Sequence, residues 1–299
     1  MTLCWTKNLN LFTNYSIPLN KSLVDDINTA KQLIYSTVKS RTLEELLCQD
    51  YEKASKKIEK FLSVYVSKSS AKGLVIGLSG GLDSSVVLKL SVNALGQSNV
   101  LGLVMPSDNT PKEDIADAVE LARNLGVRYY IIDIQPIIQK FEEILPEDKK
   151  ARGNLMARIR MSLLYYYAGI YGYLVAGTSD KSEVQIGYFS KFGDGAADIV
   201  PIALLYKTQV RALAQYLGIP GAIVQKKSSP RLWENHLAEE EIGMDYERID
   251  QILHLLVDKK LQPKEAARKL GISTKDVNKV QYMIERSFHK RRPSAIVTL

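Results

Sequence analysis

The sequence predicts an α/β protein with a doubly wound parallel sheet, helices on both faces of that sheet, and further helical segments at both ends of the chain. Short apolar runs of strand length alternate with amphipathic helical segments, which is the pattern of βαβ units. The runs are continuously apolar, as in strands that are buried on both faces. Polar and glycine-rich segments follow several strands, and ligands of such sheets bind at the carboxyl ends of strands.

The elements can be assigned in chain order from hydrophobic periodicity. Residues 1–21 are irregular, and two helices are expected over 22–38 and 43–67. The predicted strands cover 74–78, 100–105, 129–133 and 173–177. Between and after them, helices are expected from residue 83, around 115–125, over 152–170 and over 207–217, and the chain is helical and charged from about residue 240.

Composition limits the class of protein before any motif is considered. The 299 residues are 45% hydrophobic and 24% charged, as in soluble globular proteins. No apolar run reaches membrane-spanning length and residues 1–21 lack a signal-peptide core, so a cytoplasmic protein with no membrane partner is expected. Cys4 and Cys48 stand outside any CxxC spacing, which predicts neither a disulfide framework nor a zinc site. The net charge of +7 suits nucleotides or nucleic acid and does not choose between them.

A glycine-rich loop between the first strand and its helix carries the strongest chemical signal. Its residues are Gly77, Leu78, Ser79, Gly80, Gly81, Leu82, Asp83 and Ser84. Unpaired backbone N–H groups and the dipole at a helix N-terminus favour a phosphate there. No Gly-Lys-Ser/Thr ends the loop, so it is not a Walker A motif. A carboxylate at Asp83 beside phosphates implies a divalent cation such as Mg2+.

The Ser-Gly-Gly-Leu-Asp-Ser string resembles the pyrophosphate-binding loop of the ATP pyrophosphatase family. That family has the adenine nucleotide alpha-hydrolase-like fold and includes NAD, GMP, asparagine and argininosuccinate synthetases and tRNA-modifying enzymes. Its members share one step, in which a substrate oxygen attacks the ATP α-phosphate and pyrophosphate leaves. The loop therefore implies a reaction class but not a substrate.

A second set of residues narrows the range of possible substrates. It comprises Arg158-Ile159-Arg160-Met161, Gly177-Thr178, Glu183, the run from Gly187 to Gly195, and Asp198. This set resembles NAD synthetases, and the likeness runs from about residue 50 to Pro293. It is closest to the short, ammonia-using form, since the chain has no room for the amidohydrolase domain of glutamine-dependent enzymes. The resemblance implies ATP-dependent amidation of deamido-NAD by ammonia, through an acyl-adenylate, to give NAD, AMP and pyrophosphate.

The resemblance also implies roles for individual residues. ATP contacts are expected from the residues 77–84, Thr178, Lys207 and Ser229, and magnesium ligation from Asp83 and Glu183. Deamido-NAD contacts are expected from Arg158, Lys191, Asp198, His289 and Lys290, the last two reaching a partner subunit's substrate in the family's homodimers. Asp83, Lys207 and Asp194 are the candidate catalytic residues, with Asp194 or Asp198 orienting ammonia or accepting its proton. The synthetase-like domain is expected over 46–299, after an N-terminal extension of residues 1–45 that has no recognised counterpart.

Two loop segments depart from the family pattern. The family's K-x-P-S/T loop reads here from Lys226 to Pro230, with Ser228 in place of the proline. After Trp233 the chain has Asn235-His236 where Gly-Gln is common, and Ala238-Glu239 where an Asp-Glu pair is common, so a polar contact is expected to be lost.

Two other classes of protein compete with this interpretation. Residues 264–290 have the pattern of a helix-turn-helix, with Gly271 in the turn and a basic end, which is also typical of nucleic-acid-binding proteins. Another amidating or tRNA-modifying ATP pyrophosphatase is the second alternative. Thiolases of that group use cysteines, which here lie far from every motif, and GMP synthetases lack the pattern from Lys191 to Asp198.

Overall fold

The computed structural model describes residues 41–297. Its centre is a four-stranded parallel sheet in the order β3-β2-β1-β4. The strands are β1 (Leu74–Gly77), β2 (Val100–Val104), β3 (Arg128–Ile131) and β4 (Leu174–Ala176). The chain builds outward from β1 to β3 and then returns to place β4 on the other side of β1, with Leu74 opposite both Val100 and Leu174. The crevice between β1 and β4 is therefore the topological switch point, where ligands of such sheets bind.

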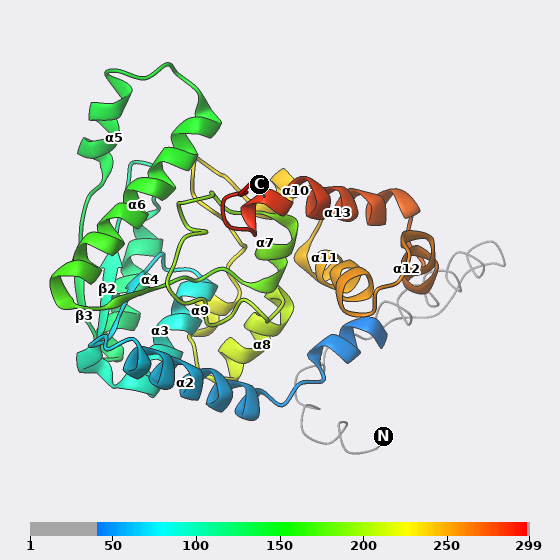
Figure 1. The fold of residues 1–299 in the computed structure, drawn as a ribbon, viewed down its shortest axis with the longest axis horizontal. Coiled ribbons are helices and arrows are strands. Elements are labelled where there is room, and N and C mark those ends of the chain that lie inside the picture. The colour runs from blue at the N-terminus through cyan, green and yellow to red at the C-terminus, as the bar shows by residue number, and fades with distance from the viewer. Residues whose placement is uncertain (1–40, 298–299) are drawn as a thin grey trace, which may run out of the picture.

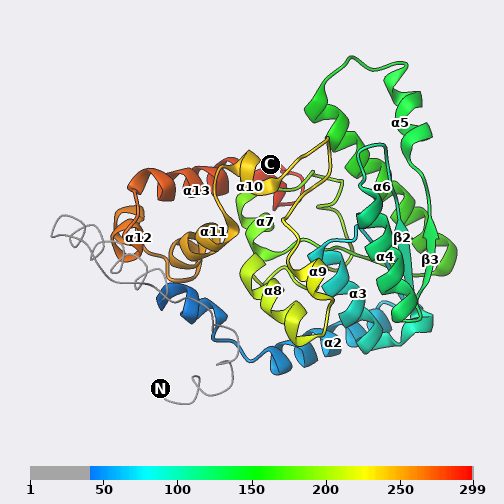
Figure 2. The same cartoon turned by 180° about the vertical axis from the view of Figure 1, so that it is seen from behind.

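Helices cover both faces of this sheet, which confirms the predicted doubly wound architecture (Figures 1 and 2). One core contains Leu74 and Ile76 of β1, and the helices packed there are α2 (Tyr51–Lys68), α3 (Leu82–Leu95), α4 (Lys112–Asn124), α8 (Lys207–Tyr216) and α9 (Gly221–Val224). The opposite core contains Val75 and is covered by α5 (Gln135–Glu142) and α6 (Lys149–Tyr171). Because Leu74, Val75 and Ile76 point alternately to opposite faces and are all buried, the strand is a continuous apolar run in the sequence.

A separate helical unit extends away from the sheet (Figure 1). Its elements are α10 (Ala238–Ile242), α11 (Tyr246–Leu253), the π-helical turn His254–Asp258, α12 (Pro263–Leu270), α13 (Thr274–Arg286) and the 3-10 turn Phe288–Lys290. Its own core also contains Ile186 and Tyr206, which join it to α7 (Lys181–Ile186) and to the start of α8. Gly271, at a φ of 62°, forms the predicted turn between α12 and α13.

Several boundaries differ from the sequence prediction. The helix predicted over 43–67 is two segments, 41–47 and α2, because the Asp50 side chain accepts from the Lys53 N–H and starts a new helix. The expected loop between β4 and α8 contains α7, which is too short to show periodicity. The helix predicted over 22–38, and most of the N-terminal extension, lie outside the described residues. Within 41–297 no helix is long and apolar enough to cross a membrane.

Cys48 is disulfide-bonded, whereas the sequence analysis predicts no disulfide framework. The other cysteine of the sequence, Cys4, lies outside the described residues.

Candidate active site

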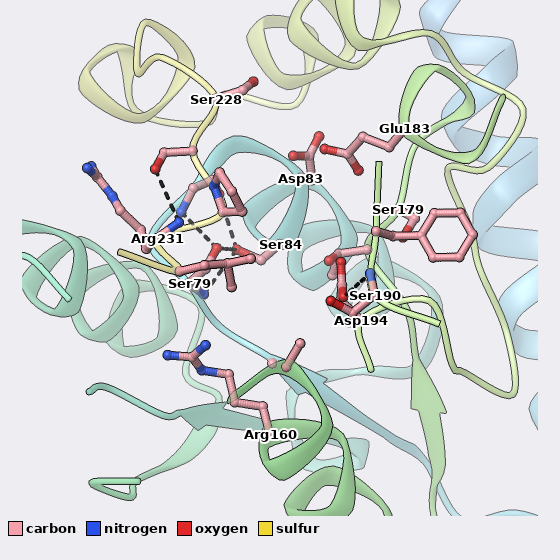
Figure 3. A pocket seen from close by; sticks show the side chains of 18 of the residues that line it. Ser79, Asp83, Ser84, Arg160, Ser179, Glu183, Ser190, Asp194, Ser228 and Arg231 are labelled. Carbon is pink, nitrogen blue, oxygen red and sulfur yellow. Dashed lines mark hydrogen bonds between the residues drawn. The ribbon is translucent and has the colours of Figure 1, made fainter. Parts of the chain in front are cut away.

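A cavity of about 420 Å³ opens at the switch point between β1 and β4. The loop after β1 and the loop after β4 form its two sides, and α6 and the segment 226–233 complete it (Figure 3). Predicted site residues that line it are Gly77, Leu78, Ser79, Gly81, Leu82, Asp83, Ser84, Thr178, Glu183, Asp194, Ser229 and Lys290. The structure thus brings together most of the ATP-binding residues predicted from the sequence.

The glycine-rich loop presents a bare helix N-terminus to this cavity. Gly81 is the N-cap of α3, and within the described chain no side chain caps the first turn. Gly80 has a φ of +70°, and a Cβ added there would lie 2.0 Å from the backbone oxygen of Asp114. Only glycine lets the loop pass so close to α4 with a positive φ. The first-turn N–H groups of α3 are therefore available to an anion.

Two serine hydroxyls fix the shape of this loop. The Oγ atoms of Ser79 and Ser84 lie 3.0 Å apart, and Ser79 Oγ accepts from the Gly81 N–H at 3.2 Å (Figure 3). The Ser85 hydroxyl donates to the Gly81 carbonyl at 2.8 Å. The serines thus satisfy groups inside the loop and leave the outer N–H groups facing the cavity.

Lys207 is the centre of an acidic cluster beside that loop. Its Nζ lies 2.7 Å from Asp83 Oδ2, 2.9 Å from Asp180 Oδ2 and 2.9 Å from Glu183 Oε1. The Lys207 side chain is 1% exposed and that of Asp180 is 0% exposed, whereas Asp83 and Glu183 are about one-fifth exposed, at 22% and 20%. Lys207 therefore lies behind two carboxylates that reach the cavity.

Burial and neighbouring charges shift the pKa values of these groups in opposite directions. Burial lowers the pKa of Lys207, but the negative charges of Asp180, Asp83 and Glu183 outweigh it and raise that pKa well above its ordinary value. Burial raises the pKa of Glu183 well above its usual range, against the opposing effect of Lys207. Lys207 is therefore a permanent cation that contacts three carboxyl groups.

Asp83 and Glu183 fit a divalent cation. Both approach the Lys207 ammonium from the cavity side, and Figure 3 shows their side chains directed toward each other. Asp83 Oδ1 is buried and has no hydrogen-bond partner within residues 41–297. That part of the chain holds no ready cluster of three or more metal-ligating side chains. Mg2+ commonly takes only one or two carboxylates and completes its shell with water and substrate phosphates, so this pair suffices.

The residues predicted to contact deamido-NAD fall into two groups. Lys191 Nζ donates to the His289 carbonyl at 2.9 Å, and Arg158 Nε donates to the Lys191 carbonyl at 3.3 Å, so these three lie together outside the cavity lining. Lys290 does line the cavity, and its Nζ donates to the carbonyls of Gly187 at 2.8 Å and Phe189 at 2.6 Å.

The two candidate aspartates have different surroundings. Asp194 lines the cavity and accepts from the Ser190 N–H at 2.8 Å (Figure 3). Asp198 lies outside the cavity lining, where its Oδ2 accepts from the Val175 N–H of β4 at 2.7 Å. Its other oxygen accepts from the Tyr165 hydroxyl at 3.4 Å. Asp198 thus fixes the edge of the sheet, and Asp194 is the aspartate that faces the cavity.

The atypical loop after Lys226 closes one side of the cavity. Lys226 Nζ lies 2.7 Å from Asp114 Oδ1, 2.5 Å from Asp117 Oδ2 and 3.0 Å from the Gly80 carbonyl, so it ties the loop to both α4 and the phosphate loop. Arg231 adds a second bond to Asp114, at 2.8 Å. The Ser229 hydroxyl donates to the His236 carbonyl, and Ser229 lines the cavity.

His236 supplies a polar contact in this loop, where the sequence predicts that one is lost. Its Nε2 lies 2.8 Å from Glu241 Oε2, and Glu241 also accepts from the Tyr188 hydroxyl at 2.7 Å. The ring of His236 stacks on Trp233 with centroids 3.4 Å apart. The loop is thus held by a polar network and a stacked pair of rings.

Several charged residues of the site are not among the contacts predicted from the sequence, and three of them show why. Asp180 contacts Lys207, and Arg160 and Lys226 line the cavity. Asp180 has a local signal, because Asp180 and Glu183 form a capping box at the start of α7. Arg160 and Lys226 depend on contacts with distant parts of the chain, such as the bond from Arg160 Nε to the Met105 carbonyl at 3.0 Å.

Comparison with known proteins agrees with this geometry. The family model described as NAD synthase matches residues 54–294. The chain belongs to the NAD synthase family. It is 54% identical over 253 residues to the NH(3)-dependent NAD(+) synthetase of Hyperthermus butylicus, covering 84% of this chain and 92% of the relative. It is 43% identical over 267 residues to the enzyme of the same name from Staphylothermus marinus, covering 86% of this chain and 95% of that one.

Two solved structures with different names are similar to this chain over most of its length. An NMN synthetase from Francisella tularensis is similar with a TM-score of 0.75 and 36% identity, covering 84% of this chain and 100% of that one. An NH3-dependent NAD synthetase from Campylobacter jejuni, in complex with a nitrate ion, has a TM-score of 0.72 and 32% identity over 84% of this chain and 100% of that one.

Proposed function

We propose that the protein uses ATP and ammonia to amidate deamido-NAD to NAD, with release of AMP and pyrophosphate. The observation that carries this proposal is the juxtaposition of a bare helix N-terminus with the cluster of Lys207, Asp83 and Glu183 in one cavity. The choice of deamido-NAD as the substrate is based on membership of the NAD synthase family.

The first step needs positioning and neutralisation of charge. A nicotinate carboxylate oxygen attacks the α-phosphorus of ATP, the bond to the bridging oxygen breaks, and pyrophosphate leaves. The first-turn N–H groups of α3 hold phosphate oxygens, and Lys207 stabilises negative charge from behind Asp83 and Glu183. We assign Mg2+ to Asp83 and Glu183, where it would supply further neutralisation of the phosphates.

The second step replaces AMP with an amino group. The nitrogen of ammonia attacks the acyl carbon of the adenylate, the bond to AMP breaks, and the nitrogen loses a proton. Asp194 is our candidate for the group that orients ammonia or accepts this proton, because it faces the cavity. Its surroundings raise the pKa of Asp194, mainly through desolvation, which moves it toward the range of a useful base.

We further propose that two copies of the chain form the functional unit, as the resemblance implies. Arg158, Lys191 and His289 form a surface cluster outside the cavity lining of their own subunit. A second subunit would let this cluster contact a substrate that extends beyond the cavity. Sedimentation or light scattering of the purified chain, at several concentrations, tests the dimer directly.

The nucleic-acid alternative has less support. The apolar faces of α12 and α13 are buried in the core of the helical unit, through residues such as Leu270 and Val277. Of the basic end, Lys290 donates to the two carbonyls named above, and Arg291 donates to those of Gln185 at 2.8 Å and Ile284 at 2.6 Å. These side chains serve packing within the chain.

The deciding experiment incubates the protein with ATP, Mg2+, ammonium and deamido-NAD, and measures NAD, AMP and pyrophosphate. Equal amounts of the three products are expected. Parallel reactions replace deamido-NAD with nicotinate mononucleotide, because one similar structure is that of an NMN synthetase, and replace ammonium with ammonia-free glutamine. Product from the mononucleotide alone, or equal turnover with glutamine, would contradict the proposal.

A further inference from the structure

The first turn of α8, which carries Lys207, is held by side chains from two other helices. The Lys207 N–H donates to Ser182 Oγ of α7 at 2.9 Å, and the Thr208 N–H donates to Asp250 Oδ2 of α11 at 2.8 Å. First-turn N–H groups have no partner within their own helix, so these bonds satisfy groups that would otherwise be buried and unpaired.

Asp250 connects the two anchors. The Ser182 hydroxyl donates to Asp250 Oδ1 at 2.5 Å while it accepts from the Lys207 N–H. Ser182 and Asp250 are both completely buried, at 0% exposure. The Asp250 carboxylate of α11 thus holds α7 next to Glu183 and α8 at Lys207. Glu183 and Lys207, which contact each other in the candidate site, are therefore supported by the same side chain.

Tyr246 approaches the same lysine from one turn earlier on α11. Residues four apart lie on the same face of a helix, so Tyr246 and Asp250 both face α8. The Lys207 Nζ lies 5.2 Å from the centroid of the Tyr246 ring, within the range of a cation–π contact. Tyr246 is 3% exposed, and its hydroxyl has no hydrogen-bond partner in the described chain. The ring, rather than the hydroxyl, is therefore its contact with the lysine.

We propose that Asp250 and Tyr246 are positioning residues that determine where the Lys207 ammonium lies. The inference rests on the proposed synthetase activity, in which Lys207 stabilises charge in the adenylation step. The helical unit would then contribute to catalysis as well as to stability, because α11 belongs to that unit and its position determines that of Lys207.

The test compares Asp250→Asn and Ser182→Ala with the wild type in the synthetase assay. The carboxylate uses one oxygen for the Ser182 hydroxyl and the other for the Thr208 N–H, and an amide has only one oxygen. Asp250→Asn therefore weakens the attachment of α7 and α8 to α11 and keeps the volume of the side chain. A shift of Lys207 affects the transition state more than bound ATP. We expect kcat to fall about 10- to 100-fold, as for other residues that orient a reacting group, with KM for ATP almost unchanged.

Two further variants separate positioning from general loss of structure. Ile252→Val removes a methyl group from an equally buried site on α11 that packs into the helical core, and serves as the matched control. Tyr246→Leu removes the ring and should lower kcat, whereas Tyr246→Phe keeps the ring and should restore most of it. Circular dichroism and thermal unfolding of each variant give the folded fraction to which kcat is normalised.

The outcomes are distinct. If the wild type forms no NAD in any arm, the proposed function fails. If the wild type is active and Asp250→Asn and Ser182→Ala keep their normalised kcat, or lose no more than Ile252→Val, the positioning role is refuted. A fall in kcat confined to the variants that face Lys207, with Tyr246→Phe restoring activity, supports it.

Discussion

Replacing Lys207 by methionine should destabilise the protein as well as inactivate it. The lysine ammonium contacts Asp83, Asp180 and Glu183, at 2.7 to 2.9 Å. Methionine keeps most of the volume but leaves three carboxylates without this cation. Removing one partner of a buried charge pair typically costs about 3–5 kcal/mol. Water reaches two of the carboxylates here, so we expect about 3 kcal/mol, measured by urea unfolding without Mg2+.

The same reasoning predicts a rescue. Asp180 is fully buried and suffers most from the loss of Lys207, so Asp180→Asn added to Lys207→Met should recover part of the lost stability. Mg2+ should stabilise Lys207→Met more than the wild type, since Asp83 and Glu183 are no longer shared with an ammonium group. Saturation at 100 times Kd would contribute about 2.7 kcal/mol. The reasoning is refuted if the free energy of unfolding of Lys207→Met lies within about 0.5 kcal/mol of the wild-type value. It is also refuted if the double variant is less stable than Lys207→Met.

Three further predictions follow from named contacts. Gly80→Ala should raise KM for ATP at least tenfold, because its Cβ would meet the Asp114 backbone; unchanged ATP kinetics would contradict the proposed phosphate loop. Asp83→Asn and Glu183→Gln should each shift the Mg2+ activation curve to higher concentration with little loss of stability, and curves like that of the wild type would exclude both as ligands. Burial raises the pKa of Asp250 to about 7 from 3.8, so its contribution to stability is present below pH 3.8 and is lost as pH rises through 7. The stability of wild type relative to Asp250→Asn should therefore fall between pH 4 and 7 by up to about 4 kcal/mol, and a flat difference would show that Asp250 does not titrate there.

The parts of the site that the sequence predicts well are those set by local chemistry. The strand, the glycines and the start of the helix depend on neighbours in the chain, so the sequence alone is enough to predict this strand, loop and helix. The same holds for the sheet, because continuously apolar runs have few alternatives to burial on both faces.

The parts that could not be predicted depend on contacts between distant segments. Lys207 and Asp83 are 124 residues apart, and in the sequence only the family resemblance indicates that they act together. Asp250 belongs to no motif, and the role proposed for it depends on the packing of α11 against α7 and α8. The hydrogen bond that Asp198 accepts from the Val175 N–H likewise joins residues 23 positions apart, and no motif in the sequence indicates it.

The balance of charge in the cavity supports the proposed magnesium site. Six basic side chains line the cavity, against five acidic ones. Two of the basic residues, Lys226 and Arg231, are paired with Asp114, and Lys290 is bound to carbonyl groups. Lys207 is outnumbered by its carboxylates. The protein therefore supplies donors that orient the phosphates but little net positive charge to offset them. The divalent cation that we propose at Asp83 and Glu183 would provide this charge, and it would give a partner to the buried Asp83 Oδ1, which has none in the described chain.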